Sequence, residues 1–239
     1  MTTGSSTTTL PRIPLPPITT DPAERQAWIA LALVPELGPR RLAALLARYD
    51  SPRAILDLPR AALRDIPGFS ATLAARLHRA FGEASADAVI RGAEAAGQRL
   101  LTPADADFPP LLRVIPDPPL VLFVRGEVAL LAEPMVAIVG SRRHTRYGAE
   151  VAAELGRVAA RAGIVVASGM ALGLDACAQS AALEGGGRSV GVLGTGLDVV
   201  YPPANHALHR TLLERGALVS EHPPGTRAHP SAFPRRNRI

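Results

Sequence analysis

The chain has 239 residues, of which 47% are hydrophobic, and this is enough apolar material for one sizeable core and a second, smaller one. Its 26 basic residues are all arginine, which excludes mechanisms that need a lysine amine, such as a Walker A site, a Schiff base or a pyridoxal anchor. The single cysteine, Cys177, excludes an intramolecular disulfide and a cysteine-rich zinc site and fits a reducing compartment.

The N-terminal composition and the hydropathy indicate where the protein works. The first twenty residues contain nine Ser or Thr and four Pro but no apolar segment typical of a signal peptide, so we expect a disordered leader over residues 1–20. No apolar run reaches the roughly 18 residues that a membrane span needs. These observations favour a cytoplasmic protein.

The net charge of +5 is unevenly distributed along the chain. Residues 1–139 contain 14 Arg and 14 acidic residues, whereas residues 140–239 contain 12 Arg and 7 acidic residues. We therefore expect the C-terminal part to face a polyanion. Arginines scattered over solvated helix surfaces would give the same composition, so charge alone does not decide the function.

Residues 21–97 have the pattern of a small all-α domain, with short helices broken by Pro and Gly. Two stretches, 34–42 and 66–77, share an apolar residue and a proline, a glycine turn at Gly38 or Gly68, and an amphipathic helix. Both resemble helix-hairpin-helix or SAM-like units, whose turn amides contact DNA phosphates without reading bases. Because any helical packing unit can use such a turn, DNA contact by this domain is the less favoured interpretation.

Residues 98–134 are a proline-rich connector with one apolar strand, Leu120–Val124, expected at the edge of the following sheet. After Pro134 short apolar runs alternate with amphipathic helices. This pattern predicts an α/β fold over residues 135–239: a Rossmann-like, doubly wound, mostly parallel sheet with helices on both faces. The expected strands are Met135–Val139, Ile164–Ala167, Ser189–Leu193 and Ala217–Ser220, and the expected helices are Tyr147–Ala162, Leu174–Leu183 and Ala204–Arg215.

Ligands of an open parallel sheet bind outside the carboxyl ends of its strands, so the loops after the strands are the candidate site. Glycines let the backbone approach an anion, while hydroxyls, amides and helix N-termini stabilise it. Three loops of this composition therefore predict a phosphate site. Their residues are Gly140, Ser141 and Arg142; Ser168 and Gly169; and Gly194, Thr195 and Gly196.

Residues that are missing from these loops exclude some classes of phosphate-containing ligand. A dinucleotide fingerprint would need a third glycine where Val199 stands, and a nucleoside triphosphate site would need a lysine. Asp175 and Asp198 are available for acid-base chemistry, but Asp175 opens a helix and equally fits a simple cap. The six histidines show no metal-ligand spacing, and we expect His206 and His209 at the surface. The sequence predicts neither a cofactor nor a metal.

The last segment places Arg235, Arg236 and Arg238 beside Phe233 and Asn237. Guanidinium groups bind phosphates bidentately and an aromatic ring stacks on a base, a combination found in sites for single-stranded nucleic acid. A basic, solvated tail is the alternative, but the neighbouring sheet edge favours a nucleic-acid site.

Five segments, in this order and spacing, resemble the DprA/Smf family of bacterial DNA-processing proteins of natural transformation. The resemblance extends from the helical domain through Phe108-Pro-Pro-Leu-Leu and Leu122-Phe-Val-Arg-Gly of the connector to the last residue. The segments are residues 136–142, 168–175, 192–203, 220–226 and 233–239.

The resemblance implies a non-catalytic protein that binds single-stranded DNA, displaces single-strand-binding protein and loads the RecA recombinase. It implies a DNA pocket at the carboxyl edge of the sheet. Two positions depart from the family: Leu172 stands where a basic residue is usual, and Gln179 where a histidine is frequent. The implied pocket residues are Gly140, Ser141, Arg142, Arg188, Phe233, Arg235, Asn237 and Arg238.

The resemblance also implies that the sheet is incomplete at the C-terminus. Similar proteins continue past the position of Ile239 through more of the sheet and often into a winged-helix domain. The family's homodimer surface lies in that part. We therefore expect a C-terminally truncated chain whose exposed sheet edge promotes aggregation.

Two other functions remain open from the sequence. The first is a nucleotide phosphoribohydrolase of the lysine-decarboxylase-like Rossmann group, but the glutamate of that group's signature is missing after Gly194-Thr-Gly196. The second is a double-stranded DNA scaffold acting through residues 21–97, which have only a small basic excess. We therefore expect a DNA-binding protein and not an enzyme.

Overall fold

The computed structural model describes residues 15, 18–34, 37–49, 51–83 and 86–239. Most of the expected leader, residues 1–14 and 16–17, lies outside the described residues. Within the described part, no helix is long and apolar enough to cross a membrane.

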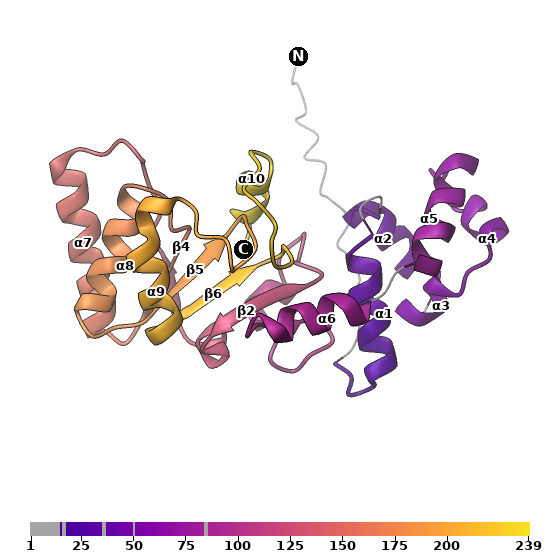
Figure 1. The fold of residues 1–239 in the computed structure, drawn as a ribbon, viewed down its shortest axis with the longest axis horizontal. Coiled ribbons are helices and arrows are strands. Elements are labelled where there is room, and N and C mark those ends of the chain that lie inside the picture. Colours follow the sequence, from indigo (N-terminus) through magenta and orange to yellow (C-terminus); the bar gives the residue numbers. More distant parts are fainter. Residues whose placement is uncertain (1–14, 16–17, 35–36, 50, 84–85) are drawn as a thin grey trace, which may run out of the picture.

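The N-terminal half of the described chain is helical (Figure 1). The first helix begins after Asp21, whose carboxylate accepts the Ala23 amide, and the third begins after Ser51, whose hydroxyl accepts the Ala54 amide; both are N-caps. The helices are α1 (Pro22–Ala32), α2 (Pro39–Leu46), α3 (Pro52–Leu56), α4 (Arg60–Arg64), α5 (Ala71–Glu83) and α6 (Ala86–Ala95).

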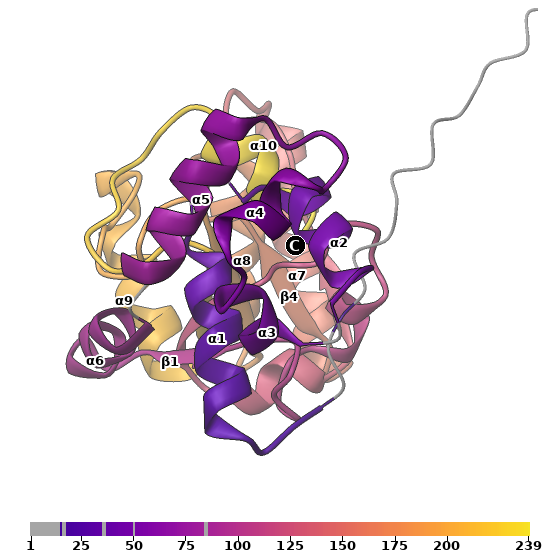
Figure 2. The ribbon, with the colours of Figure 1, turned by 90° about the vertical axis from the view of Figure 1, so that its right-hand side faces the viewer.

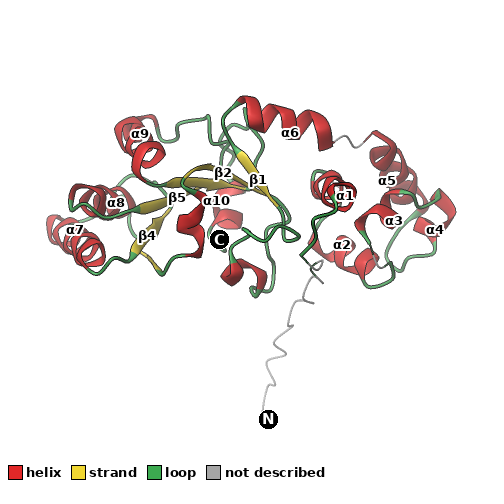
Figure 3. Cartoon of the chain, turned by 90° about the horizontal axis from the view of Figure 1, so that it is seen from below, coloured by secondary structure: helices red, strands yellow, loops and turns green. Residues whose placement is uncertain are grey.

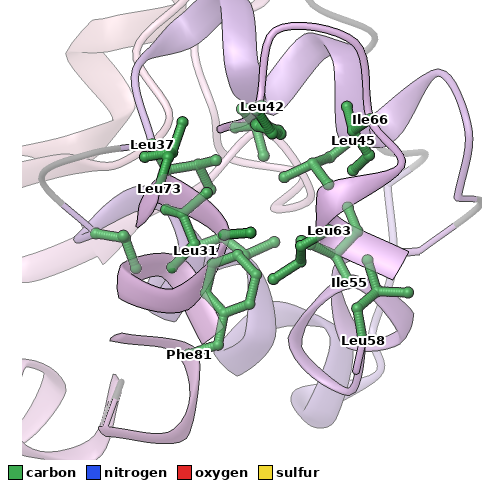
Figure 4. Packing of buried hydrophobic residues seen from close by; sticks show 14 of the residues in the cluster. Leu31, Leu37, Leu42, Leu45, Ile55, Leu58, Leu63, Ile66, Leu73 and Phe81 are labelled. Carbon is green, nitrogen blue, oxygen red and sulfur yellow. The ribbon is translucent and has the colours of Figure 1, made fainter. Parts of the chain in front are cut away.

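Helices α1 to α5 enclose one apolar core, in which Leu31, Leu45, Ile55 and Leu63 are completely buried (Figure 4). The core reaches the connector through Trp28, whose indole Nε1 donates to the Leu120 carbonyl at 2.6 Å. The helical expectation for this part of the chain is confirmed.

Helix α6 packs differently from the other five. It contacts α1 and strand β1 (Arg99–Leu101), and Figure 2 shows α6 and β1 beside α1. Its buried residues, Ala86 and Ala93, belong to the same apolar cluster as Ile29 of α1 and Phe123 of the sheet. The helical part and the sheet therefore share a core.

The sheet has six strands in the order β1-β2-β6-β5-β4-β3. Strands β3 to β6 are parallel to one another, β2 is antiparallel to β6, and β1 is antiparallel to β2. This mixed α/β, Rossmann-like architecture behind a helical part confirms the predicted fold class. The remaining strands are β2 (Leu122–Gly126), β3 (Met135–Ala137), β4 (Val165–Ser168), β5 (Ser189–Leu193) and β6 (Ala217–Ser220).

The connector strand is not at the sheet edge, contrary to expectation. Residues Arg99–Leu101 form the edge strand β1, which pairs with β2 so that Leu100 lies opposite Phe123. A strand of three residues is too short to show a period in the sequence, which is why β1 was missed.

The crossover helices also differ from the expectation of helices on both faces. Helices α7 (Arg146–Arg161), α8 (Leu174–Glu184) and α9 (His206–Arg215) lie next to one another on one face (Figure 3). The parallel strands follow one another in a single direction across the sheet, and right-handed crossovers then place every helix on the same side.

The opposite face of the sheet is covered by short elements. Val190 and Val219 of this face pack with Phe108, with Leu130 of the 3-10 helix η2 (Val128–Ala132) and with Ile239. A further 3-10 helix, η1 (Pro110–Arg113), adds Leu112.

Helix α7 carries apolar side chains that nothing in the described part covers. They lie at helical spacing along one side of the helix, and the neighbouring edge strand β3 adds Val136. The exposed residues of α7 are Tyr147, Val151, Leu155 and Val158.

Candidate nucleic-acid interface

The loops predicted to carry function lie at one edge of the sheet, because β3, β4 and β5 are parallel and end together. The short helix α10 (Ala232–Arg236) lies at this edge, above the arrowhead of β5 in Figure 1. A cavity of about 450 Å³ opens between the first two loops and the last segment of the chain. Its polar lining includes Gly140, Arg142, Ser168, Gly169, Asp175, Arg236 and Asn237.

The carboxylate of Asp175 accepts hydrogen bonds from backbone amides that were expected to bind phosphate. This side chain is buried, and its Oδ1 accepts the Gly140 amide at 3.1 Å while its Oδ2 accepts the Gly169 amide at 3.1 Å and the Ala171 amide at 3.4 Å. Asp175 therefore joins the loops after β3 and β4. Both amides already have an acceptor inside the protein, and phosphate binding by Gly140 and Gly169 stays a prediction.

The hydroxyls of the same loops are also used internally. They were expected to donate to phosphate oxygens, but each donates to a backbone carbonyl, so they shape the loops instead. Ser141 Oγ donates to Arg143 at 2.9 Å, Ser168 Oγ to Ile138 at 2.5 Å, and Thr195 Oγ1 to Val199 at 3.2 Å. The Gly196 amide likewise donates to the Thr226 carbonyl.

Arg236 is a half-buried cation of the site. It was counted among the three arginines of the last segment, but the family resemblance did not include it among the implied pocket residues. Its Nη1 donates to the carbonyl of Gly169 at 2.7 Å and to that of Val192. Burial lowers the pKa of Arg236, while the charge of Asp175 raises it; a guanidinium stays protonated in either case. Arg236 stands three residues after Phe233 and so shares its helix face, a signal that could have identified it.

Arg142 and two aromatic side chains form a second group at this edge. The Arg142 guanidinium carbon lies 5.8 Å from the centroid of the Phe233 ring, a cation–π distance. The rings of Phe233 and Tyr201 are 5.5 Å apart and tilted by 32°. A smaller cavity of about 70 Å³ is lined by these three residues together with Leu172, Gly194, Thr195 and Arg236.

Three arginines predicted for the pocket lie elsewhere. Arg188 precedes β5 and so lies at the opposite end of that strand, 3.7 Å from a carboxylate oxygen of Glu127. Arg238 forms ion pairs with the carboxylates of Asp117 and Glu221. Arg235 lines a different cavity, of about 340 Å³, with His222 and Gly38. The direction of a side chain in a short helix depends on how that helix is docked, which the sequence does not show.

Burial in the folded protein changes the pKa of two histidines, His209 and His222. His209, expected at the surface, is buried, and its Nε2 donates to the Leu197 carbonyl at 3.1 Å. Burial lowers the pKa of His209 and of His222. His206 is exposed, as expected.

The fold and the site define an α/β protein with a helical N-terminal part and a basic, aromatic-lined site at the carboxyl edge of its sheet. Comparison with known families gives two matches: SAM-like helix-hairpin-helix tandem over residues 29–93, and DNA recombination-mediator protein A over residues 99–239. The chain belongs to the DNA recombination-mediator protein A family, the DprA/Smf proteins.

Several curated relatives support this membership. Protein Smf of Synechocystis is 32% identical over 221 residues, which are 91% of this chain and 56% of that protein. Protein Smf of Escherichia coli is 43% identical over 141 residues, 58% of this chain and 38% of that protein. The chain therefore spans about half the length of the curated relatives it matches, or less.

Two solved structures are similar. The crystal structure of DprA from Streptococcus pneumoniae matches with a TM-score of 0.72 and 26% identity, over 92% of this chain and 74% of that one. DprA from Helicobacter pylori, whose structure concerns its single-stranded DNA binding mode, matches with a TM-score of 0.54 and 32% identity. The match covers 59% of this chain and 63% of that one.

Proposed function

We propose that this protein binds single-stranded DNA at the carboxyl edge of β3, β4 and β5. The observation that carries this proposal is the grouping of Arg142, Arg236, Phe233 and Tyr201 around adjoining cavities. Cations for the backbone and rings for the bases are what a site for single strands requires. The single-stranded DNA binding of the H. pylori relative supports the same choice.

In this proposal side chains, not backbone amides, supply most of the attraction for phosphate. The amides of Gly140 and Gly169 are taken by Asp175, whereas Arg142 is exposed and pairs with no carboxylate in the described part of the chain. In the free protein its guanidinium covers the Phe233 ring. A base that stacks on Phe233 takes this place and releases Arg142 toward the neighbouring phosphate.

The biological role proposed here follows from family membership. The protein would displace single-strand-binding protein from incoming DNA and load RecA onto the strand during natural transformation, in the cytoplasm and with no catalytic step. The test of this part is RecA filament formation on oligonucleotides covered with single-strand-binding protein, with and without this protein. An unchanged rate would contradict it.

The binding proposal is tested with a labelled oligothymidine, measured by fluorescence anisotropy at several salt concentrations, with duplex of equal length as competitor. Arg142→Gln should make the log–log salt slope shallower by about 0.7, the value for one single-strand phosphate. Phe233→Leu should weaken binding at an unchanged slope, because a stacked base releases no counterion.

The matched control is Arg188→Gln, which removes an arginine at the other end of β5 and should leave binding and slope unchanged. Binding by Arg142→Gln that equals the parent at all salt concentrations would contradict the proposed site. A loss in Arg188→Gln as large as that in Arg142→Gln would place the DNA elsewhere.

A further inference from the structure

Arg238 joins three segments of the chain that are far apart in the sequence. Its Nε lies 2.9 Å from Oδ2 of Asp117, in the connector before β2, and its Nη2 lies 2.5 Å from Oε1 of Glu221, directly after β6. The Arg238 and Glu221 side chains are only 20% and 15% exposed. A guanidinium shared by two carboxylates in a partly buried place fixes its backbone more firmly than a surface ion pair does.

The element held by this network carries the aromatic and basic residues of the DNA site. Helix α10 has five residues, and a helix of this length is not stable by itself. Its position therefore depends on its anchors. One anchor is Arg236, bonded to the carbonyls of Gly169 and Val192. The other is Arg238, which directly follows the C-cap residue Asn237.

We propose that Arg238 is a positioning residue of the DNA site and not a phosphate ligand. Its two carboxylate partners hold the end of α10 so that Phe233 lies beside Arg142 and Tyr201. This inference rests on the proposed function, and it reassigns a residue that the family resemblance implied to contact DNA. The Nε and Nη2 atoms of Arg238 already face carboxylates, which a DNA phosphate would have to displace.

The first test is a double-mutant cycle on oligothymidine binding. Phe233→Leu in the parent should weaken binding by about tenfold, whereas in an Arg238→Gln background it should weaken binding less than about twofold, because α10 is no longer held at the site. Arg238→Gln alone should leave the salt slope unchanged. Arg238→Lys keeps the charge but not the two-carboxylate fork, so its affinity should lie between the parent and Arg238→Gln.

The matched control is Arg25→Gln. Arg25 of α1 makes a similar part-buried ion pair, 2.8 Å from Asp105, and also donates to the Leu100 carbonyl of β1. In this background the effect of Phe233→Leu should stay at its parental size. Urea unfolding, followed through the single tryptophan Trp28, should show that each variant is folded.

A second test needs no DNA. Hydrogen exchange should be faster by about tenfold for the Asn237 amide, which bonds to the Phe233 carbonyl at 3.2 Å, in Arg238→Gln but not in Arg25→Gln. The Cys177 amide of α8, bonded to Gly173, should be unchanged in both and serves as the internal reference.

Three results would overturn the inference: additive effects of Phe233→Leu and Arg238→Gln, unchanged exchange at Asn237, or a salt slope shallower by about 0.7 in Arg238→Gln, which would show a phosphate contact. Failure of the parent to bind oligothymidine would overturn the proposed function instead. The exchange experiment then still decides whether Arg238 holds α10.

Discussion

The carboxylate of Asp175 accepts a hydrogen bond from the amide of Gly140, which lies 35 residues earlier in the chain, at 3.1 Å. Through its other oxygen it also accepts the amide of Gly169. One buried side chain at the start of α8 therefore fixes the separation of the loops after β3 and β4, and it places a negative charge beneath the two arginines of the site.

Replacing Asp175 by Ala should lower the free energy of unfolding by about 3 kcal/mol, because it leaves three part-buried loop amides without their acceptor and Arg236 without its nearby negative charge. Urea unfolding measures this loss. Asp198→Ala is the control, since Asp198 is exposed and, among the described residues, accepts only the Gly225 amide, at 2.9 Å; it should cost about 1 kcal/mol. Equal losses in the two variants would show that Asp175 does not have this role.

Gly169 has no room for a side chain. A Cβ at this position would fall on the Arg236 guanidinium, so Gly169→Ala must displace this cation from the Gly169 and Val192 carbonyls. We expect oligothymidine binding to weaken by about tenfold and stability to fall by about 1–3 kcal/mol. Gly148→Ala, whose Cβ would meet the Thr145 hydroxyl at 3.4 Å, should bind DNA as the parent does. Parental binding by Gly169→Ala would show that the position of Arg236 does not matter.

Two glycines inside helices should respond in opposite directions to alanine. The Cβ of an alanine at position 156 would collide with the Ala178 carbonyl of α8, whereas nothing lies within 4 Å at Gly92 of α6. Gly156→Ala should therefore destabilise the protein by about 1–3 kcal/mol, and Gly92→Ala should stabilise it by about 0.5–1 kcal/mol. Thermal or urea unfolding of both variants measures these changes in stability. A stabilised Gly156→Ala would contradict the close packing of α7 on α8.

Stability should fall as the pH is lowered through the range where histidine titrates. Burial lowers the pKa of His209 and His222 below the ordinary 6.5, so the unfolded chain binds protons first. The neutral histidines contribute their full stability above about pH 6.5, and this contribution is lost as the pH falls toward the folded pKa. His209→Gln should reduce the difference in unfolding free energy between about pH 8 and about pH 5. An unchanged difference would exclude His209 as a source.

The apolar stripe on α7 should promote self-association. Leu155 is 50% exposed beside Val151 and Val158, so Leu155→Glu should reduce light scattering at high protein concentration while changing stability by less than about 1 kcal/mol. Leu111→Glu on η1 replaces a leucine that is 72% exposed but lies away from α7. If both variants scatter equally, the stripe is not the cause.

The sequence alone determined the α/β class and the edge of the sheet at which the site lies. The apolar runs Ser189–Leu193 and Ala217–Ser220 coincide with β5 and β6, because short buried strands between amphipathic helices leave a local pattern. Parallel strands end at one edge whatever their order, so the convergence of the three glycine-rich loops followed from the same pattern.

The tertiary structure decided which groups face the ligand. Asp175 takes the glycine amides, Arg236 enters the site, and Arg238 pairs with Asp117, 121 residues away. Such choices depend on the distances between segments that only the packed fold brings together, and a hydrogen bond depends on distances of tenths of an ångström. A sequence motif shows which donors and charges are present, whereas the packing of the chain determines which of them are already paired within the protein.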